Sequence, residues 1–186
     1  MEECGMKEKN YPLQMVREDL EDIPAFGLPS PYRFRMYQAG DEVAWVAIHE
    51  KADRYNQVTL ATFREQFGTD EETLKDRQMY LCDGDGSAVG TITAWFDQDE
   101  SGEAIGRVHW VAIVPAHQGK GLAKPMMTAV LERLRALGHV KTVLLTDHLR
   151  GPAVNLYLKF GFKPVIANER DREVWEKLQR DLSSGR

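Results

Sequence analysis

Cysteine is scarce in this sequence of 186 residues, and long apolar runs are missing from it. The two cysteines, Cys4 and Cys82, are too few for a disulfide framework or for a cysteine-rich zinc site. The longest uncharged run that we find, Val108–Gly119, is too short to span a bilayer and contains a proline. The first ten residues lack the apolar core of a signal peptide. We therefore expect a cytoplasmic protein that has no membrane partner.

An excess of basic residues is also missing. The chain has 24 lysines and arginines against 29 acidic residues, which gives a formal net charge of -5 at pH 7. Proteins that bind duplex nucleic acid usually carry a basic face, and we find no basic run, so no nucleic acid partner is expected. The length suits one domain. We expect a polar, proline-punctuated N-terminal arm over residues 1–30 and a single domain over residues 31–186.

Hydrophobic periodicity predicts an α/β domain in which helices and strands are interspersed. The expected helices are Asp41 to about Ala52, Thr59–Phe67, Gly121–Leu137, Pro152–Phe160 and Asp171–Leu182. The expected strands are Tyr32–Gln38, Met79–Cys82, Ala88–Phe96, Gly106–Val114, Val140–Thr146 and Phe162–Ile166. Within the arm, Met15–Asp22 is interpreted as one short helical piece.

The most informative segment lies between the most apolar strand and the longest amphipathic helix. There, Gly119 and Gly121 flank Lys120 where the helix begins. Glycines leave backbone N–H groups exposed at a helix start, and the helix dipole adds partial positive charge. Such a turn suits a phosphate or pyrophosphate. It is neither a Walker A loop, which needs glycine at Val114, nor a Rossmann loop, which needs glycine at Lys124.

Two motifs, in order along the chain, point to a family. The segment Gln118–Ala123 (QGKGLA) matches the pattern Q/R-x-x-G-x-G/A, and the segment Ala153–Phe162 (AVNLYLKFGF) matches A-x-x-L-Y-x-K-x-G-F. Both patterns, in this order and separated by a helix and a strand, resemble those of the GNAT superfamily of N-acetyltransferases. The resemblance spans about Tyr32 to Ile166.

The resemblance implies a mixed, mostly antiparallel sheet with helices on both faces. Its fourth and fifth strands, here Gly106–Val114 and Val140–Thr146, would splay apart. The cosubstrate acetyl-CoA would lie in that opening, with its pantetheine amides paired to the backbone of Ile113 and Val114. No metal is implied. Its pyrophosphate would be held by backbone N–H groups of one continuous segment, Gln118, Gly119, Lys120, Gly121, Leu122 and Ala123.

The sequence departs from the family at two places. Many members have an asparagine seven residues before the tyrosine of the second motif, and this chain has Arg150 there, so the asparagine's contact stays unassigned. Many members also continue into a seventh strand where this chain has the helix Asp171–Leu182.

Acetyl transfer to an amine needs a neutral amine and a stabilised leaving thiolate. The resemblance makes Tyr157 the candidate acid for the thiolate. His109 is the candidate base, because its position matches a histidine that one member of the family carries on the same strand. Arg107, two residues away, is expected to lower the pKa of His109 or to bind a carboxylate on the acceptor. Asp147, His148 and an ordered water stay open as alternative bases.

The expected function is therefore acetyl-CoA-dependent N-acetylation of a primary amine by direct attack in a ternary complex. The alternative is a non-catalytic acyl-CoA-binding sensor on the same fold, which needs neither Tyr157 nor His109. The acceptor amine, on a small molecule or a peptide, matches no motif that we can name. The choice of acyl group and a homodimeric state are equally open.

Overall fold

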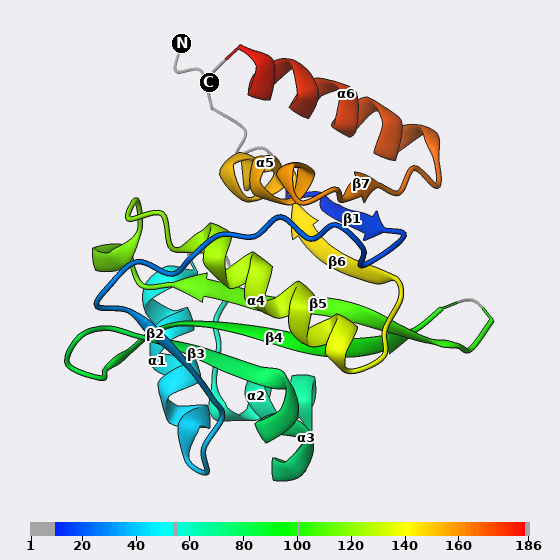
Figure 1. Cartoon of the computed structure of the whole chain (residues 1–186). Helices are drawn as coiled ribbons and strands as arrows, with labels where there is room; N and C mark the ends of the chain where they lie inside the picture. The colour runs from blue at the N-terminus through cyan, green and yellow to red at the C-terminus, as the bar shows by residue number, and fades with distance from the viewer. Residues whose placement is uncertain (1–9, 54–55, 100, 185–186) are drawn as a thin grey trace. The chain divides into compact units, whose positions relative to one another are not determined.

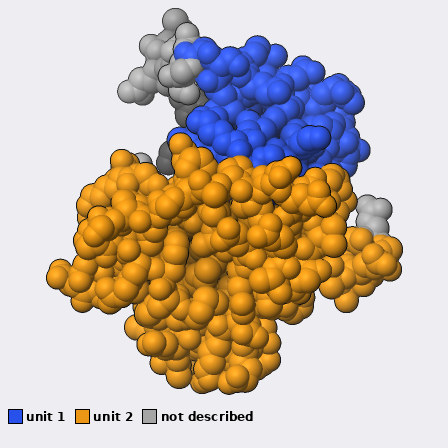
Figure 2. Space-filling model, viewed as in Figure 1, with its two compact units in different colours: residues 1–17, 144–186 blue, residues 18–143 orange. Residues whose placement is uncertain are grey.

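The structure is a computed structural model that describes residues 10–53, 56–99 and 101–184 (Figure 1). The chain divides into two compact units, which Figure 2 shows in different colours. The larger unit comprises residues 18–143, and the smaller unit comprises residues 1–17 and 144–186.

The sheet of the larger unit is built mainly from antiparallel neighbours. Its strands, in spatial order, are β2 (Arg33–Met36), β3 (Gln78–Cys82), β4 (Ala88–Gln98) and β5 (Ala104–Ile113). The next strand, β6 (Thr142–Asp147), pairs with β5 in parallel, and only Gly106–Arg107 and Thr142–Val143 take part. Among the described residues, β5 has no ladder partner on its β6 side beyond Arg107.

Helices cover both faces of this sheet (Figure 1). Helix α4 (Ala123–Ala136) packs on β4 and β5 from one face, and α1 (Asp41–Ala52) packs on the same strands from the other. Helix α2 (Leu60–Phe67) packs beside α1. The following helix, α3 (Glu71–Arg77), was not expected from the sequence. It has seven residues and buries only Leu74, so its apolar periodicity is too short to detect.

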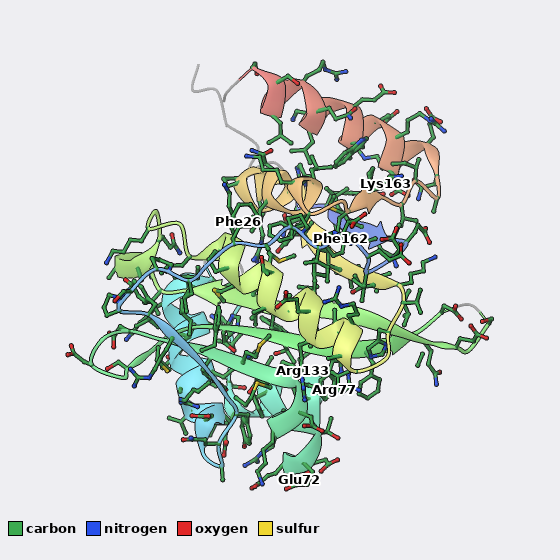
Figure 3. All side chains as sticks on the ribbon, viewed as in Figure 1. Phe26, Glu72, Arg77, Arg133, Phe162 and Lys163 are labelled. Atoms are coloured by element: carbon green, nitrogen blue, oxygen red, sulfur yellow. The ribbon has the colours of Figure 1, made fainter. Side chains whose placement is uncertain are left out.

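Part of the predicted N-terminal arm is fixed to α4. The Thr128 hydroxyl donates a hydrogen bond to the carbonyl of Pro24 (2.7 Å) and accepts one from the N–H of Phe26 (3.2 Å). The ammonium of Lys124 lies 4.9 Å from the centre of the Phe26 ring, whose position Figure 3 shows. The arm segment therefore crosses the helix that begins at the glycine-rich turn.

The smaller unit contains β1 (Pro12–Arg17), β7 (Lys163–Pro164) and helices α5 (Gly151–Lys159) and α6 (Glu169–Ser183). Strand β1 pairs antiparallel with β7, and α5 packs against α6. The interpretation of Met15–Asp22 as helical is wrong. Leu13, Met15 and Arg17 are buried while their neighbours are not, which is the period of two that a paired strand requires.

The described residues thus form seven strands and six α-helices, with the parallel pair β5–β6 beside mostly antiparallel ones. This confirms the predicted fold class. The other predicted strands and helices are present with ends shifted by a few residues, except that the strand expected over Phe162–Ile166 is only two residues long. The division into an arm and a single domain stays a prediction.

Candidate functional site

The glycine-rich turn connects β5 to α4 in the larger unit. A short 3-10 turn, Pro115–His117, follows the strand, and residues 118–122 then lead into the helix. Gly119 and Gly121 have φ angles of 75° and 76°, a backbone conformation that L side chains rarely adopt. A Cβ atom at either position would meet nothing within 4 Å. The glycines are therefore required by the backbone conformation, and the space above them is open.

Most backbone donors of this turn have no partner among the described residues, although the N–H of Gln118 donates to the Pro115 carbonyl at 3.2 Å. The N–H groups of Gly119 through Ala123 make no hydrogen bond to any described residue, and the N-cap residue Leu122 provides no side-chain cap. The exposed cation Lys120 lies among them, and the first turn of α4 contains no acidic residue. Free N–H groups, a helix N-terminus and a lysine together favour a bound anion. The geometry fits the phosphate role that the sequence predicts for Gln118–Ala123.

The end of β5 is held in place by its own turn. The Gln118 side-chain amide donates to the Ile113 carbonyl at 2.7 Å, and the Val114 carbonyl accepts from the N–H of His117 at 2.9 Å. The Val114 N–H donates to the carbonyl of Val89 on β4 at 2.9 Å. A carbonyl oxygen has two lone pairs, so both carbonyls retain one acceptor site. Pairing of Ile113 and Val114 with a pantetheine arm stays a prediction.

His109 lies at a β-bulge. Thr93 pairs with His109 and Thr91 pairs with Ala112, so Trp110 and Val111 on β5 together oppose a single residue of β4. Trp110 has a φ of 49°, as a bulge residue can. The bulge breaks the alternation of side chains, and His109 and Trp110 both make ring contacts with the aromatic side chains of α1 and α2. Periodicity cannot reveal such an irregularity.

The environment of His109 keeps its imidazole neutral. The side chain is 7% exposed, and the edge of the Phe67 ring packs against it at a centroid distance of 5.4 Å. Burial, followed by the charges of Arg107 and His49, lowers the pKa of His109 to about 3. The direction expected from Arg107 is therefore confirmed, although burial is the larger cause. Arg107 itself contacts the carboxylate of Asp97 at 3.3 Å.

Tyr157 lies in the smaller unit, on α5. Gly161, with a φ of 79°, ends the helix in a Schellman motif, in which the N–H of Phe162 donates to the Tyr157 carbonyl and the N–H of Gly161 to that of Leu158. The Phe162 ring, labelled in Figure 3, packs edge-on against the Tyr157 ring at 6.1 Å. Burial raises the pKa of Tyr157 to about 12. The hydroxyl is therefore a proton donor, and not an anion, at neutral pH.

The alternative bases are engaged in other contacts. The Nδ1 atom of His148 accepts a hydrogen bond from the backbone N–H of Tyr11 at 3.1 Å, so that lone pair is not available to a substrate proton. The carboxylate of Asp147 lies 3.4 Å from the guanidinium of Arg150. Arg150, which stands where many family members have asparagine, therefore forms an ion pair with Asp147, three residues before it.

None of the helices in residues 10–53, 56–99 and 101–184 is long and apolar enough to cross a membrane. In the same residues, no three histidine, cysteine, aspartate or glutamate side chains gather as a metal-binding group.

A model of the acetyltransferase (GNAT) family matches residues 42–162 of this chain. The chain belongs to the acetyltransferase (GNAT) family. The matched segment begins in α1 and ends just after α5, so it contains both motifs that the sequence analysis singled out.

The chain is also similar to curated members of the family. It is 31% identical over 170 residues to the mycothiol acetyltransferase of Thermobispora bispora, with 85% of this chain and 55% of that protein covered. It is 32% identical over 146 residues to the mycothiol acetyltransferase of Pseudarthrobacter chlorophenolicus, with 76% and 45% covered. This chain spans about half the length of these curated relatives.

Solved structures share the fold. A GCN5-related N-acetyltransferase from Sphaerobacter thermophilus superposes with a TM-score of 0.68 at 20% identity, over 84% of this chain and 49% of that one. A chain of the NatC complex, which is bound to Gag peptide and CoA, superposes with a TM-score of 0.62 at 16% identity, over 73% and 86%. At these identities the likeness shows the architecture alone.

Proposed function

We propose that this chain is an acetyl-CoA-dependent N-acetyltransferase, which moves the acetyl group to a primary amine by direct attack in a ternary complex. The observation that carries the proposal is the turn over Gln118–Ala123, in which the N–H groups from Gly119 onward have no described partner and the positive-φ glycines leave an open anion site at the start of α4. Membership of the GNAT family supports acetyl-CoA as the bound anion.

In this proposal, the N–H groups of Gly119 through Ala123 hold the pyrophosphate, and Lys120 adds a full positive charge beside it. The N–H of Gln118, which the sequence analysis included, donates instead to the Pro115 carbonyl at 3.2 Å. The backbone of Ile113 and Val114 orients the pantetheine arm. Acetyl-CoA supplies an activated thioester when it is bound. The protein then has two tasks, which are to take a proton from the attacking amine and to stabilise the departing thiolate.

We assign these two tasks to His109 and Tyr157. A neutral imidazole can accept a proton, and burial holds His109 in that form. Tyr157 keeps its proton at neutral pH, so it can donate a hydrogen bond to the thiolate. The low pKa makes His109 a weaker base than an ordinary histidine. The proton affinity of its ring therefore depends on the groups that surround it.

The names of the curated relatives favour a small-molecule amine over a protein as the acceptor. The test is a panel of primary amines, from alkylamines to peptide N-termini, incubated with acetyl-CoA and this chain and examined by mass spectrometry. The proposal expects an acetylated product from at least one amine. If acetyl-CoA binds and no amine in the panel is acetylated, the sensor alternative gains support.

Replacing Tyr157 with phenylalanine is expected to lower kcat about tenfold or more while leaving acetyl-CoA affinity nearly unchanged. The hydroxyl acts on the leaving thiolate, which does not exist in the bound cosubstrate, so its loss raises the barrier without weakening binding. Initial rates and calorimetric titration with acetyl-CoA measure the two quantities.

The matched control for that variant is Tyr11→Phe, which removes a hydroxyl that donates to Asp171 at 2.7 Å in the same unit. It should leave kcat close to that of the wild type. If Tyr157→Phe keeps full activity, the acid role is wrong; if it weakens acetyl-CoA binding alone, Tyr157 serves packing.

A further inference from the structure

A row of buried polar side chains crosses three neighbouring strands beneath α1 and α2. Gln78 on β3 pairs with Thr93 on β4, and Thr93 pairs with His109 on β5. Residues that face each other across neighbouring strands project from the same side of the sheet, with Cβ atoms about 4.5–5.5 Å apart. Gln78 and Thr93 are 0% exposed, and His109 is 7% exposed. The three polar groups therefore lie next to one another, away from bulk solvent.

This row lacks the hydrogen bonds that burial demands. Among the described residues, the Thr93 hydroxyl and the Gln78 Nε2 atom are buried without a hydrogen-bond partner. The neighbouring His109 ring makes aromatic contacts with Phe67 and Trp110. The Oε1 atom of Gln78 accepts from the Tyr80 hydroxyl at 2.7 Å, so only the amino end of that amide is unsatisfied. Buried polar groups are almost always hydrogen-bonded, and two adjacent exceptions beside an imidazole indicate a shared partner.

The surroundings of the row are aromatic. Phe67 packs edge-on against His109, and Trp45, itself 0% exposed, packs against Phe67 at 5.6 Å. The Nε1 atom of Trp45 is also without a partner. The charged or titratable groups that act on His109 are Arg107 and His49, and neither is a carboxylate. No described acidic side chain provides the missing hydrogen-bond partner for Gln78 or Thr93.

A single water molecule can bridge polar groups at the spacing of adjacent strands. A water about 2.8 Å from each of two polar atoms joins groups that are up to roughly 5.6 Å apart, which matches side chains on adjacent strands. Buried waters typically make about three hydrogen bonds to otherwise unsatisfied groups, and the row offers a donor, a hydroxyl and an imidazole.

We propose that Gln78 and Thr93 hold ordered water against the His109 imidazole, and that this water passes the proton of the attacking amine to the ring. The second half of the proposal rests on the proposed function. When the amine nitrogen has bonded to the thioester carbon, it carries a positive charge. The water accepts a proton from that nitrogen and gives one of its own to His109, so that it is regenerated. Gln78 and Thr93 are positioning residues in this scheme.

The water also accounts for how a dehydrated histidine can act as a base. Burial lowers the pKa of His109 because the imidazolium form loses hydration. A water fixed by Thr93 restores part of that hydration and raises the pKa from its dry value. Removing the Thr93 hydroxyl should therefore weaken His109 as a base without changing the binding of acetyl-CoA.

The variant Thr93→Val tests this, because it removes the hydroxyl and keeps the branched shape. We expect kcat to fall about tenfold, the rate equivalent of one hydrogen bond, with the KM for acetyl-CoA unchanged. Thr93→Ser keeps the hydroxyl and should retain most of the activity. The matched control is Thr91→Val on the same strand and face, whose buried hydroxyl donates to the Met79 carbonyl instead. It should leave kcat close to the wild type.

A second measurement does not depend on activity. With 15N-labelled histidine, the ring signals of His109, assigned by their loss in His109→Gln, are titrated by NMR in the wild type and in Thr93→Val. We expect the pKa of His109 to be lower in Thr93→Val than in the wild type by about one unit or more. An identical pKa in both proteins would overturn the water site, whichever amines are acetylated. A wild type that acetylates no amine would overturn the proposed function, and the pKa difference alone would then decide on the water.

Discussion

His109→Gln is expected to lower kcat by about 10²-fold or more while leaving the fold and acetyl-CoA binding intact. Glutamine is of similar length and can form hydrogen bonds, but its amide cannot take up a proton at neutral pH. His109 lies in the larger unit below Phe67, and the anion site of Gln118–Ala123 begins beyond the end of its strand. Steady-state kinetics give kcat, and calorimetry gives the affinity for acetyl-CoA.

The control for this experiment is His139→Gln. His139 is another partly buried histidine of the larger unit, and its Nε2 atom lies 3.4 Å from the guanidinium of Arg77. Its substitution should cost some stability and leave kcat within a few-fold of the wild type. If His109→Gln turns over as fast as the wild type, His109 is structural, and the base is to be sought at Asp147, His148 or an ordered water.

Gly121→Glu is expected to abolish the stabilisation that acetyl-CoA gives to the wild type. At about 100 times Kd, a ligand adds about 2.7 kcal/mol to the free energy of unfolding, which raises Tm by roughly 5–10 °C in a chain of this size. A glutamate at Gly121 places an anion among the free N–H groups that the pyrophosphate would use. Thermal unfolding with and without acetyl-CoA measures the difference.

Gly121→Glu also strains the backbone, and a second glycine separates that strain from the lost anion site. Gly68 has a φ of 73°, against 76° at Gly121, and a Cβ there would also meet nothing within 4 Å. Gly68→Glu should therefore lower Tm by a similar amount and keep the full rise with acetyl-CoA. An undiminished rise in Gly121→Glu would remove the phosphate assignment from this turn.

The features that the sequence predicted correctly are local ones. The turn at Gly119 and Gly121 could be predicted because all of its signals lie within six residues. These signals are the two glycines, the lysine between them and the start of a helix. Helix α4 was found because its apolar side chains repeat over fourteen residues. By contrast, the prediction of a helix over Met15–Asp22 is wrong because the extended form of its first residues, in β1, depends on pairing with β7, which lies about 150 residues away.

The environment of the candidate base could not be predicted in the same way. The contact between His109 and Phe67 depends on the packing of α2 over the sheet, and the bulge at Trp110 leaves no mark on the apolar pattern. Thr93 and Gln78 were missed as well. Alternation along β4 places Thr91 and Thr93 on one face, but only the register between strands shows that Thr93 faces His109.

The most direct test of the account is the release of free thiol from acetyl-CoA by the purified chain, followed with and without a primary amine. The account predicts slow release without amine and a rate that rises and saturates as the amine concentration increases. It also predicts that the amine-dependent part is lost in Gly121→Glu and reduced about 10²-fold or more in His109→Gln. The contradicting result is that acetyl-CoA binds to the chain and raises its Tm, yet no amine tested causes the release of thiol. That result would favour an acyl-CoA sensor.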